Sequence, residues 1–443
     1  MPRLSDPLTL PSGLTLPHRI AKAPMTENLA DSEHQATPAL EAVYRRWAAG
    51  AAGGLLVTGN LMVDRRYLER SRNVVADERL DVARLARVRQ ASGESPLIAQ
   101  LSHPGRQTNR FITGRPVAPS ADAGAVRMAG LFAKPRALED GETEAIVAGF
   151  GASARRCEEA GFEGVQVHAA HGYLLAQFLS PYVNRRSDRW GGDLEGRSRA
   201  LVEAVRSVRA STGDGFTVAV KLNSSDFRHG GFTEDDAEQV VRMLVEEGVD
   251  LVEISGGTYE NPALFGEVDE LAEQRGASRK EAYFAAFARR VRETAGRVPV
   301  MLTGGIRTRA TMEQLLEDGG VDLIGLGRPL AIDPDLTTRL LAGEDGHPLP
   351  RYSLPTVAGL AGESEWYETQ IARMGRGKDP DPGLHARARG TACPPRLRGS
   401  QRRLRRPARS AGRAPRRRPA PPRPPGRPRS RGRRRRPRRC RTR

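Results

Sequence analysis

Short apolar runs alternate with longer segments of helical periodicity over most of this chain. The runs are rich in β-branched residues and lack the strict alternation of a half-exposed strand, which is typical of parallel strands buried on both faces. Eight of them predict strands, at Arg19–Ala23, Gly54–Thr58, Leu97–Leu101, Gly164–His168, Thr217–Leu222, Leu251–Ser255, Val300–Thr303 and Leu323–Gly325.

The segments between the later strands combine a helical period with charged residues. Five of them predict helices, at Thr143–Ala160, Glu195–Ser211, Glu234–Glu247, Glu281–Ala295 and Thr308–Glu317. Thr233 is the expected N-cap of the third, and acidic residues fill its first turn, where they interact favourably with the helix dipole. The repeated strand–helix pattern favours an α/β fold of the (β/α)8 TIM barrel type, with a doubly wound open sheet as the alternative.

The basic residues are concentrated at one end of the chain. The 443 residues carry 71 Lys and Arg against 53 Asp and Glu, a net charge of +18, but 25 arginines and no acidic residue lie between His385 and Arg443. The first 384 residues therefore hold 46 basic and 53 acidic residues, a net charge of −7. After Pro380 the composition turns to Arg, Pro, Gly and Ala, which cannot build a core. We therefore predict a catalytic domain over residues 1–380 and a disordered basic tail over residues 381–443.

Two interpretations of this tail stay open. It could be a polybasic arm that binds nucleic acid or another acidic surface, because clustered arginines neutralise phosphates. It could instead be a disordered extension without that role, including an off-frame translation of GC-rich DNA, and its composition favours this second interpretation.

The cysteines and the apolar runs limit the class of protein further. Cys157, Cys393 and Cys440 are too far apart in sequence for a zinc knuckle and too few for a disulfide framework. No apolar run approaches the roughly 18 residues that a membrane span needs, and Met1–Leu10 contains an acidic residue and prolines where a signal peptide is apolar. We expect a cytoplasmic enzyme that makes no use of a membrane.

Glycines follow the last two predicted strands. Gly304 and Gly305 come after the seventh strand, and Gly327 and Arg328 after the eighth. Many barrels hold a phosphate at this position, because backbone N–H groups converge there and an arginine fork matches phosphate oxygens. Ordinary tight turns are the alternative for one such pair alone. The two pairs together predict a phosphate site.

Polar side chains that could bind a ligand or take part in catalysis lie on or just after the earlier strands. His168 and His171 flank two alanines where the fourth strand ends, so both imidazoles could donate to one carbonyl oxygen and stabilise an enolate. A metal pair is the rival interpretation, but neither a clear third ligand nor an HExxH motif accompanies them.

Three further polar residues could take part in the site. Tyr173 carries a hydroxyl suited to general-acid catalysis. Lys221 on the fifth strand predicts either a structural salt bridge or a fixed charge beside a cofactor, and Gln100 on the third could bond a planar heterocycle.

Taken together, these residues resemble those of old yellow enzyme and its NADH:flavin oxidoreductase relatives. The residues that carry the resemblance lie in five ordered stretches: Arg19 to Thr26 (RIAKAPMT), Gln100 to Arg106 (QLSHPGR), His168 to Pro181, Asn184 to Arg197, and Gly325 to Arg328 (GLGR). The sequence departs from the family pattern at Trp190, where Tyr is usual, at Gly196, where Asn is usual, and at Lys221, where Arg is frequent.

The resemblance implies an FMN-dependent ene-reductase that takes hydride from NADPH or NADH and passes it to an enone-like small molecule. Ala23, Pro24, Met25 and Thr26 would line the isoalloxazine, Gly59 and Gln100 would contact it, and Lys221 would lie at its N1/O2 side. Gly304, Gly305, Gly327 and Arg328 would hold the phosphate, while His168 and His171 would bind the substrate carbonyl and Tyr173 would deliver the proton. A homo-oligomer is compatible with the resemblance.

Two rivals stay open at this point. One is a flavin-free lyase or isomerase barrel whose glycine turns hold a substrate phosphate. The other is nucleic-acid binding through the basic tail, which could coexist with an enzyme.

Overall fold

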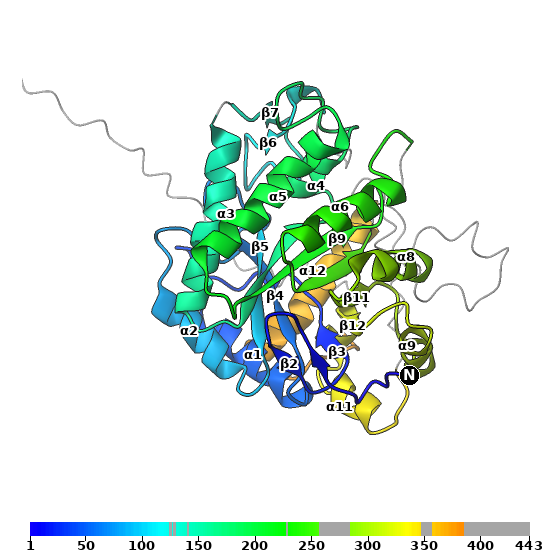
Figure 1. Cartoon of the computed structure of the whole chain (residues 1–443). Helices are drawn as coiled ribbons and strands as arrows, with labels where there is room; N and C mark the ends of the chain where they lie inside the picture. The colour runs from blue at the N-terminus through cyan, green and yellow to red at the C-terminus, as the bar shows by residue number, and fades with distance from the viewer. Residues whose placement is uncertain are drawn as a thin grey trace, which may run out of the picture. The chain divides into compact units, whose positions relative to one another are not determined.

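The fold is a closed barrel of eight parallel strands surrounded by helices (Figure 1). The computed structural model describes residues 1–123, 126, 130–139, 141–226, 229–256, 284–346 and 357–384. Around the barrel the strands follow one another as β3 (Ile20–Lys22), β4 (Leu56–Met62), β5 (Leu97–Ser102), β8 (Gly164–Ala169), β9 (Thr217–Asn223), β10 (Leu251–Ser255), β11 (Val300–Thr303) and β12 (Leu323–Leu326). The predicted TIM barrel is therefore confirmed, and β12 pairs with β3 to close it.

The second barrel strand differs from its prediction. We expected it to end near Thr58, but β4 continues to Met62. Its pairing with β5 shifts register between Val57 and Asn60, so Gly59 marks an irregularity inside the strand and not its end.

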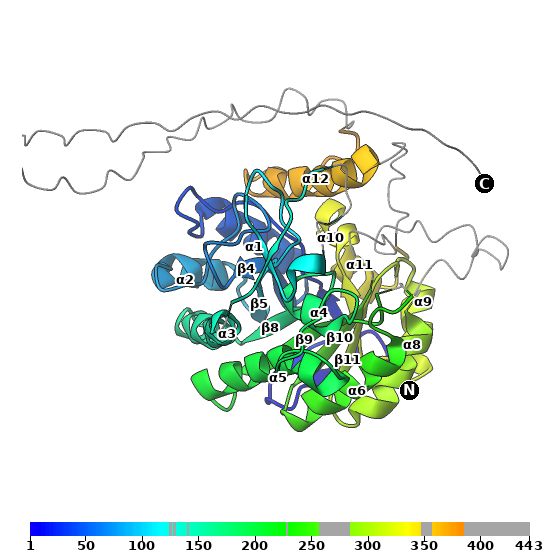
Figure 2. The ribbon, with the colours of Figure 1, turned by 90° about the horizontal axis from the view of Figure 1, so that it is seen from above.

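Helices cover the outside of the strands, as Figure 2 shows most clearly for α2, α3, α5 and α6. The described helices are α1 (Pro38–Gly50), α2 (Val82–Ala91), α3 (Glu142–Glu159), α4 (Leu174–Leu179), α5 (Leu194–Ser211), α6 (Glu234–Glu246), α8 (Ala285–Ala295), α9 (Arg309–Glu317), α10 (Arg328–Ile332), α11 (Leu336–Leu341) and α12 (Val357–Met374). Among these, none is both long enough and apolar enough to cross a lipid bilayer.

The predicted start of α6 is confirmed in detail. The Thr233 side chain accepts a hydrogen bond from the backbone N–H of Asp236 at 3.1 Å, and the Asp236 carboxylate accepts one from the N–H of Thr233 at 3.2 Å. This reciprocal pair satisfies two N–H groups that the helix itself leaves free. The other predicted helices agree within a residue or two, except that residues 281–283, at the predicted start of α8, lie outside the described residues.

The two ends of the barrel interior differ in character. At the end where the strands begin, an apolar cluster that includes Ala21, Leu55, Ile98 and Met301 fills the interior, and the hairpin of β1 (Leu8–Thr9) and β2 (Thr15–Leu16) packs against it. Towards the other end the buried side chains are polar. Such a division gives a TIM barrel a stable base and leaves the carboxyl ends of its strands for function.

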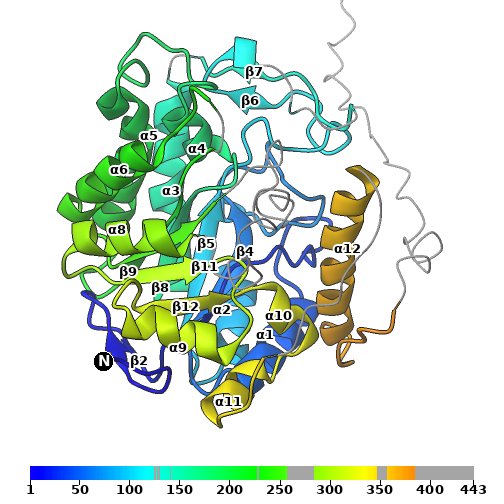
Figure 3. The same ribbon diagram turned by 90° about the vertical axis from the view of Figure 1, so that its right-hand side faces the viewer.

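One helix from late in the chain lies beside this functional end. Helix α12 packs against α1 and α10, and Figure 3 shows it alongside both. Residues just beyond it are also held, because the indole N–H of Trp366 donates to the carbonyl of Leu384 at 2.8 Å. The Arg-rich stretch from His385 onward lies outside the described residues, so the division at residue 380 and the disorder of the tail stay predictions.

Candidate active site

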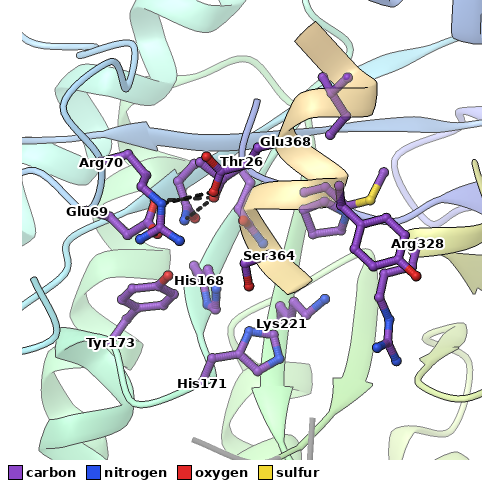
Figure 4. Close-up of a pocket in the computed structure, with 16 residues that line it drawn as sticks. Thr26, Glu69, Arg70, His168, His171, Tyr173, Lys221, Arg328, Ser364 and Glu368 are labelled. Carbon is purple, nitrogen blue, oxygen red and sulfur yellow. Dashed lines mark hydrogen bonds and ion pairs between the residues drawn. The ribbon is translucent and has the colours of Figure 1, made fainter. Parts of the chain in front are cut away.

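A hollow of about 950 Å³, counting the part open to solvent, lies at the carboxyl ends of the strands. Figure 4 shows the side chains that line it. They come from the segment after β3, from β4 and the loop after it, from β5, from β8 and the loop after it, from β9, and from helices α10 and α12. The lining residues are Pro24, Met25, Thr26, Asn60, Glu69, Arg70, Gln100, His168, His171, Tyr173, Lys221, Arg328, Ser364, Tyr367, Glu368 and Ile371.

Nine residues predicted from the sequence meet in this hollow, although they span more than 300 positions of the chain. These are Pro24, Met25, Thr26, Gln100, His168, His171, Tyr173, Lys221 and Arg328. The other five predicted residues, Ala23, Gly59, Gly304, Gly305 and Gly327, do not line the hollow itself.

The two histidines and the tyrosine form one aromatic cluster. The His168 ring lies 5.2 Å from the His171 ring and 4.7 Å from the Tyr173 ring, centroid to centroid, and both pairs meet edge to face. His168 Nδ1 accepts a hydrogen bond from the N–H of Ala170 at 3.1 Å, so a neutral His168 carries its proton on Nε2. His171 Nε2 lies 2.9 Å from the Ser255 hydroxyl. The cluster therefore holds both rings in defined orientations.

Both imidazoles are held in the neutral form. Burial lowers the pKa of His168 well below its usual range, and the nearby Lys221 cation lowers it further. The pKa of His171 is lowered in the same way, first by burial and then by Lys221 and His168. A neutral imidazole donates one hydrogen bond and accepts another, so the pair suits a neutral carbonyl or phenol.

A buried polar chain crosses the barrel behind the hollow. Gln100 Nε2 donates to Gln166 Oε1 at 2.7 Å, and Gln166 Nε2 donates to Glu253 Oε2 at 2.7 Å. The other oxygen of Glu253 accepts from Lys221 Nζ at 2.5 Å. Both interpretations of Lys221 are thus compatible with the structure, because the lysine is paired with a carboxylate and also lines the hollow.

The opposite wall carries a charged rim. The Thr26 hydroxyl donates to Glu69 Oε2 at 3.2 Å, and Arg70 forms ion pairs of 3.0 Å with both Glu69 and Glu368. Glu368 also accepts from Asn28 at 3.2 Å, so a residue of α12 is tied to the segments after β3 and β4. Burial raises the pKa of the Glu69 carboxyl, while Arg70 opposes that rise.

Gly59 is required for a reason other than the predicted ring contact. A Cβ at this position would lie 2.3 Å from Glu27 Oε2 and 2.3 Å from the carbonyl oxygen of Met25. The Gly59 N–H donates to Glu27 Oε1 at 2.8 Å, and the Tyr44 hydroxyl donates to the same oxygen. The glycine therefore lets β4 approach the Met25 backbone and the Glu27 carboxylate closely.

The predicted phosphate turns follow β11 and β12, and the first of them depends on glycine. Gly304 and Gly305 have φ of 138° and 71°, which side-chain-bearing residues rarely adopt. Gly327 lies next to the Met25 side chain, since a Cβ there would be 3.7 Å from Met25 Cγ, and Arg328 begins α10 and reaches the hollow. Gly327 and Arg328 therefore lie beside the same hollow as the histidines, and Gly304 and Gly305 follow the adjacent strand β11.

Several lining residues were missed from the sequence. Asn60 lies in the part of β4 beyond its predicted end, and Glu69 and Arg70 lie in the loop after that strand. Glu368 belongs to a helix in which no catalytic motif was recognised. Their one available signal was the adjacent charged pair Glu69-Arg70 soon after a barrel strand. In the described part of the chain, no group of three or more His, Cys, Asp or Glu side chains is placed to hold a metal ion.

Comparison with known proteins identifies the family. Residues 3–345 match the model of the NADH:flavin oxidoreductase / NADH oxidase family. The chain belongs to this family. It is 36% identical over 352 residues to the NADH-dependent flavin oxidoreductase iliE of Hypocrea jecorina, a match that covers 74% of this chain and 86% of the relative. It is also 30% identical to an NADPH dehydrogenase of a Geobacillus species, over 75% of this chain and 91% of that protein.

The likeness extends to solved structures of the family. An old yellow enzyme homologue from Zymomonas mobilis superposes with a TM-score of 0.66 at 25% identity, over 81% of this chain and 99% of that one. The resemblance to old yellow enzyme is therefore confirmed, and the family assignment makes the chain an FMN-dependent NAD(P)H oxidoreductase. A flavin-free lyase or isomerase does not agree with this assignment.

The residues around the hollow fit a flat ring with polar edges. Met25, Tyr367 and Ile371 supply apolar surface, and Gln100 and Lys221 supply polar groups from the strands. Asn60 Oδ1 is buried and has no hydrogen-bond partner among the described residues, so it is available to a bound donor. This combination of apolar faces and a few convergent polar groups is typical of cofactor sites.

Proposed function

We propose that this enzyme passes hydride from NADH or NADPH, through FMN, to activated alkenes such as α,β-unsaturated carbonyls. The observation that carries the proposal is the cluster of two neutral imidazoles and one phenol at the mouth of an FMN-family barrel. An enone needs a donor at its carbonyl oxygen and a proton at its α-carbon, and this cluster offers both.

In this proposal Pro24, Met25 and Thr26 would hold the FMN ring, and Gln100 and Lys221 would supply its polar contacts. Ala23 and Gly59 would support that wall from behind. The glycine turns at 304, 305 and 327, together with Arg328, would hold the phosphate. When bound, FMN supplies the hydride transfer that no side chain can perform.

The protein's own residues bind and polarise the substrate. His168 donates its Nε2–H to the carbonyl oxygen, because its Nδ1 is already engaged by the Ala170 N–H. His171 donates from Nδ1 when the Ser255 hydroxyl donates to its Nε2. These two donors stabilise the negative charge that develops on the oxygen, and the Tyr173 hydroxyl gives its proton to the α-carbon.

Anaerobic titration tests the proposal. We expect NADH or NADPH to bleach the yellow protein, and 2-cyclohexen-1-one to restore the colour without oxygen. Cyclohexanone has the same ring and carbonyl but no activated alkene, so it serves as the control and should leave the protein bleached. Recolouring by oxygen alone, with no response to any enone, would reject the alkene substrate while leaving the NAD(P)H oxidoreductase activity in place.

The roles of the tail and of self-association stay predictions. Nucleic-acid binding would have to come from residues that lie outside the described part of the chain, and no observation on the barrel favours it. A homo-oligomer and a cytoplasmic location are likewise expectations from the sequence alone.

A further inference from the structure

Glu253 is a carboxylate in the middle of the barrel wall, and it does not line the hollow. Its side chain is completely buried on β10, yet it touches two side chains that lead to the hollow. Through one oxygen it reaches Lys221, and through the other it reaches Gln166 and then Gln100. Strand pairing holds two of these contacts in place, because Glu253 is the register partner of Lys221 and Gln100 that of Gln166. The hydrogen bond from Gln166 to Glu253 reaches past β9, from β8 to β10.

The charge of Glu253 gives this chain of hydrogen bonds a single direction. A carboxylate only accepts hydrogen bonds, so Gln166 must turn its amide NH₂ toward Glu253. Gln166 then presents its carbonyl to Gln100, and Gln100 must donate its own NH₂. The carbonyl oxygen of Gln100 is thereby left to face the hollow as an acceptor.

The same carboxylate also balances the charge of the wall. Lys221 and Glu253 are 2% and 0% exposed, so water screens neither of them. A lone ammonium at this depth would present a full positive charge to a bound ring, whereas the ion pair presents a dipole whose positive end faces the hollow. Charge near the N1 side of a flavin is one of the protein's main controls over its reduction potential.

We propose that Glu253 is a positioning residue that lowers the reduction potential of bound FMN through Lys221 and aims the Gln100 carbonyl at the ring through Gln166. The inference rests on the proposed placement of the ring beside Gln100 and Lys221. It assigns a function to a residue that neither binds substrate nor touches the cofactor.

The charge half of the proposal is tested with Glu253→Gln in the FMN-loaded protein. The midpoint potential should move in the positive direction, and sulfite should bind about ten-fold more tightly or better, because one countercharge is lost. The lone pair of sulfite forms an S–N5 bond, and the flavin π electrons that it displaces put negative charge on the N1–C2=O edge, so sulfite affinity reports positive charge there without any turnover. Glu246→Gln removes the same charge from an exposed position on the neighbouring α6 and should change neither quantity. An unchanged or more negative potential in Glu253→Gln overturns the charge half.

The orientation half is tested with Gln166→Met, which keeps both charges and breaks the link to Gln100. FMN should dissociate about ten-fold more readily, with the midpoint potential unmoved, because one directed hydrogen bond loses its orientation. Unchanged FMN affinity overturns this half.

A further variant covers the case in which Glu253→Gln does not fold. Lys221→Met with Glu253→Gln removes both charges and leaves neither partner buried alone. Its potential should stay near that of the unaltered protein, whereas a large negative shift would mean that Lys221 acts without Glu253. If the unaltered protein bound no FMN at all, the proposed function would be refuted instead. If FMN is bound and reduced normally, but these substitutions change neither its midpoint potential nor its affinity, only the inference about Glu253 is refuted.

Discussion

The two walls of the hollow are built in opposite ways. The inner wall, defined here by Gln100, Gln166, Lys221 and Glu253, is fully buried, and two of its three side-chain contacts join register partners on adjacent strands. The rim, defined by Glu69, Arg70 and Glu368, joins a loop to a helix almost 300 residues further along, and the Arg70 side chain is 28% exposed. The barrel's geometry therefore determines the first wall, whereas tertiary packing of a late helix determines the second. We expect changes near the inner wall to alter chemistry and changes at the rim to alter little.

The largest effect is expected for Tyr173→Phe, which removes the proposed proton donor from the hollow. The oxidative half-reaction with an enone should slow by about 10² to 10⁴, while reduction of FMN by NAD(P)H should keep its rate, because only the first needs a proton from the protein. Stopped-flow measurement of the two half-reactions separates them.

Tyr182→Phe is the matched control, since Tyr182 does not line the hollow. Equal slowing of both half-reactions in Tyr173→Phe would show that the hydroxyl shapes the site without acting as the acid.

A moderate effect is expected at the rim. In a double-mutant cycle with Arg70→Met and Glu368→Gln, the coupling energy should be no more than about 1 kcal/mol, because the pair is partly exposed and screened. Urea unfolding of the four proteins measures it. Arg70→Met alone should lower the free energy of unfolding by more than this coupling energy, since it also leaves the buried Glu69 without its cation. A coupling energy of about 3 kcal/mol or more would show that Arg70 and Glu368 behave as a buried ion pair. The rim and the inner wall would then not differ in the way described above.

The smallest effect is expected from pH. An ordinary histidine gains a proton as the pH falls through about 6.5, but burial lowers the pKa of His168 and of His171 well below that value. Both imidazoles therefore stay neutral, and the affinity for a neutral phenol should be constant between about pH 8 and pH 6. Titration of FMN absorbance with the phenol at each pH measures this. An affinity that breaks near pH 6.5 would mean that at least one imidazole titrates normally.

The contrast also explains what could be predicted from the sequence. The strand pattern predicted the barrel, and residues at the ends of strands, such as His168, Lys221 and Arg328, met in one hollow because parallel strands bring their carboxyl ends together. Glu253 was not predicted, because a lone acid inside an apolar strand shows its role only once the neighbouring strand is in register with it. Glu368 could not be predicted either, since no periodicity indicates which distant loop a helix will pack against.

The pairing of β12 with β3 has a consequence during synthesis. Ile20 pairs with Ile324, so one edge of β3 has no partner until roughly 300 further residues have left the ribosome, which takes about 15 to 60 s at ordinary elongation rates of about 5–20 residues per second. An unpaired strand edge invites association with other chains. The nascent protein therefore passes through a long interval in which chaperones can protect it, and FMN can stabilise the barrel only after that interval has ended.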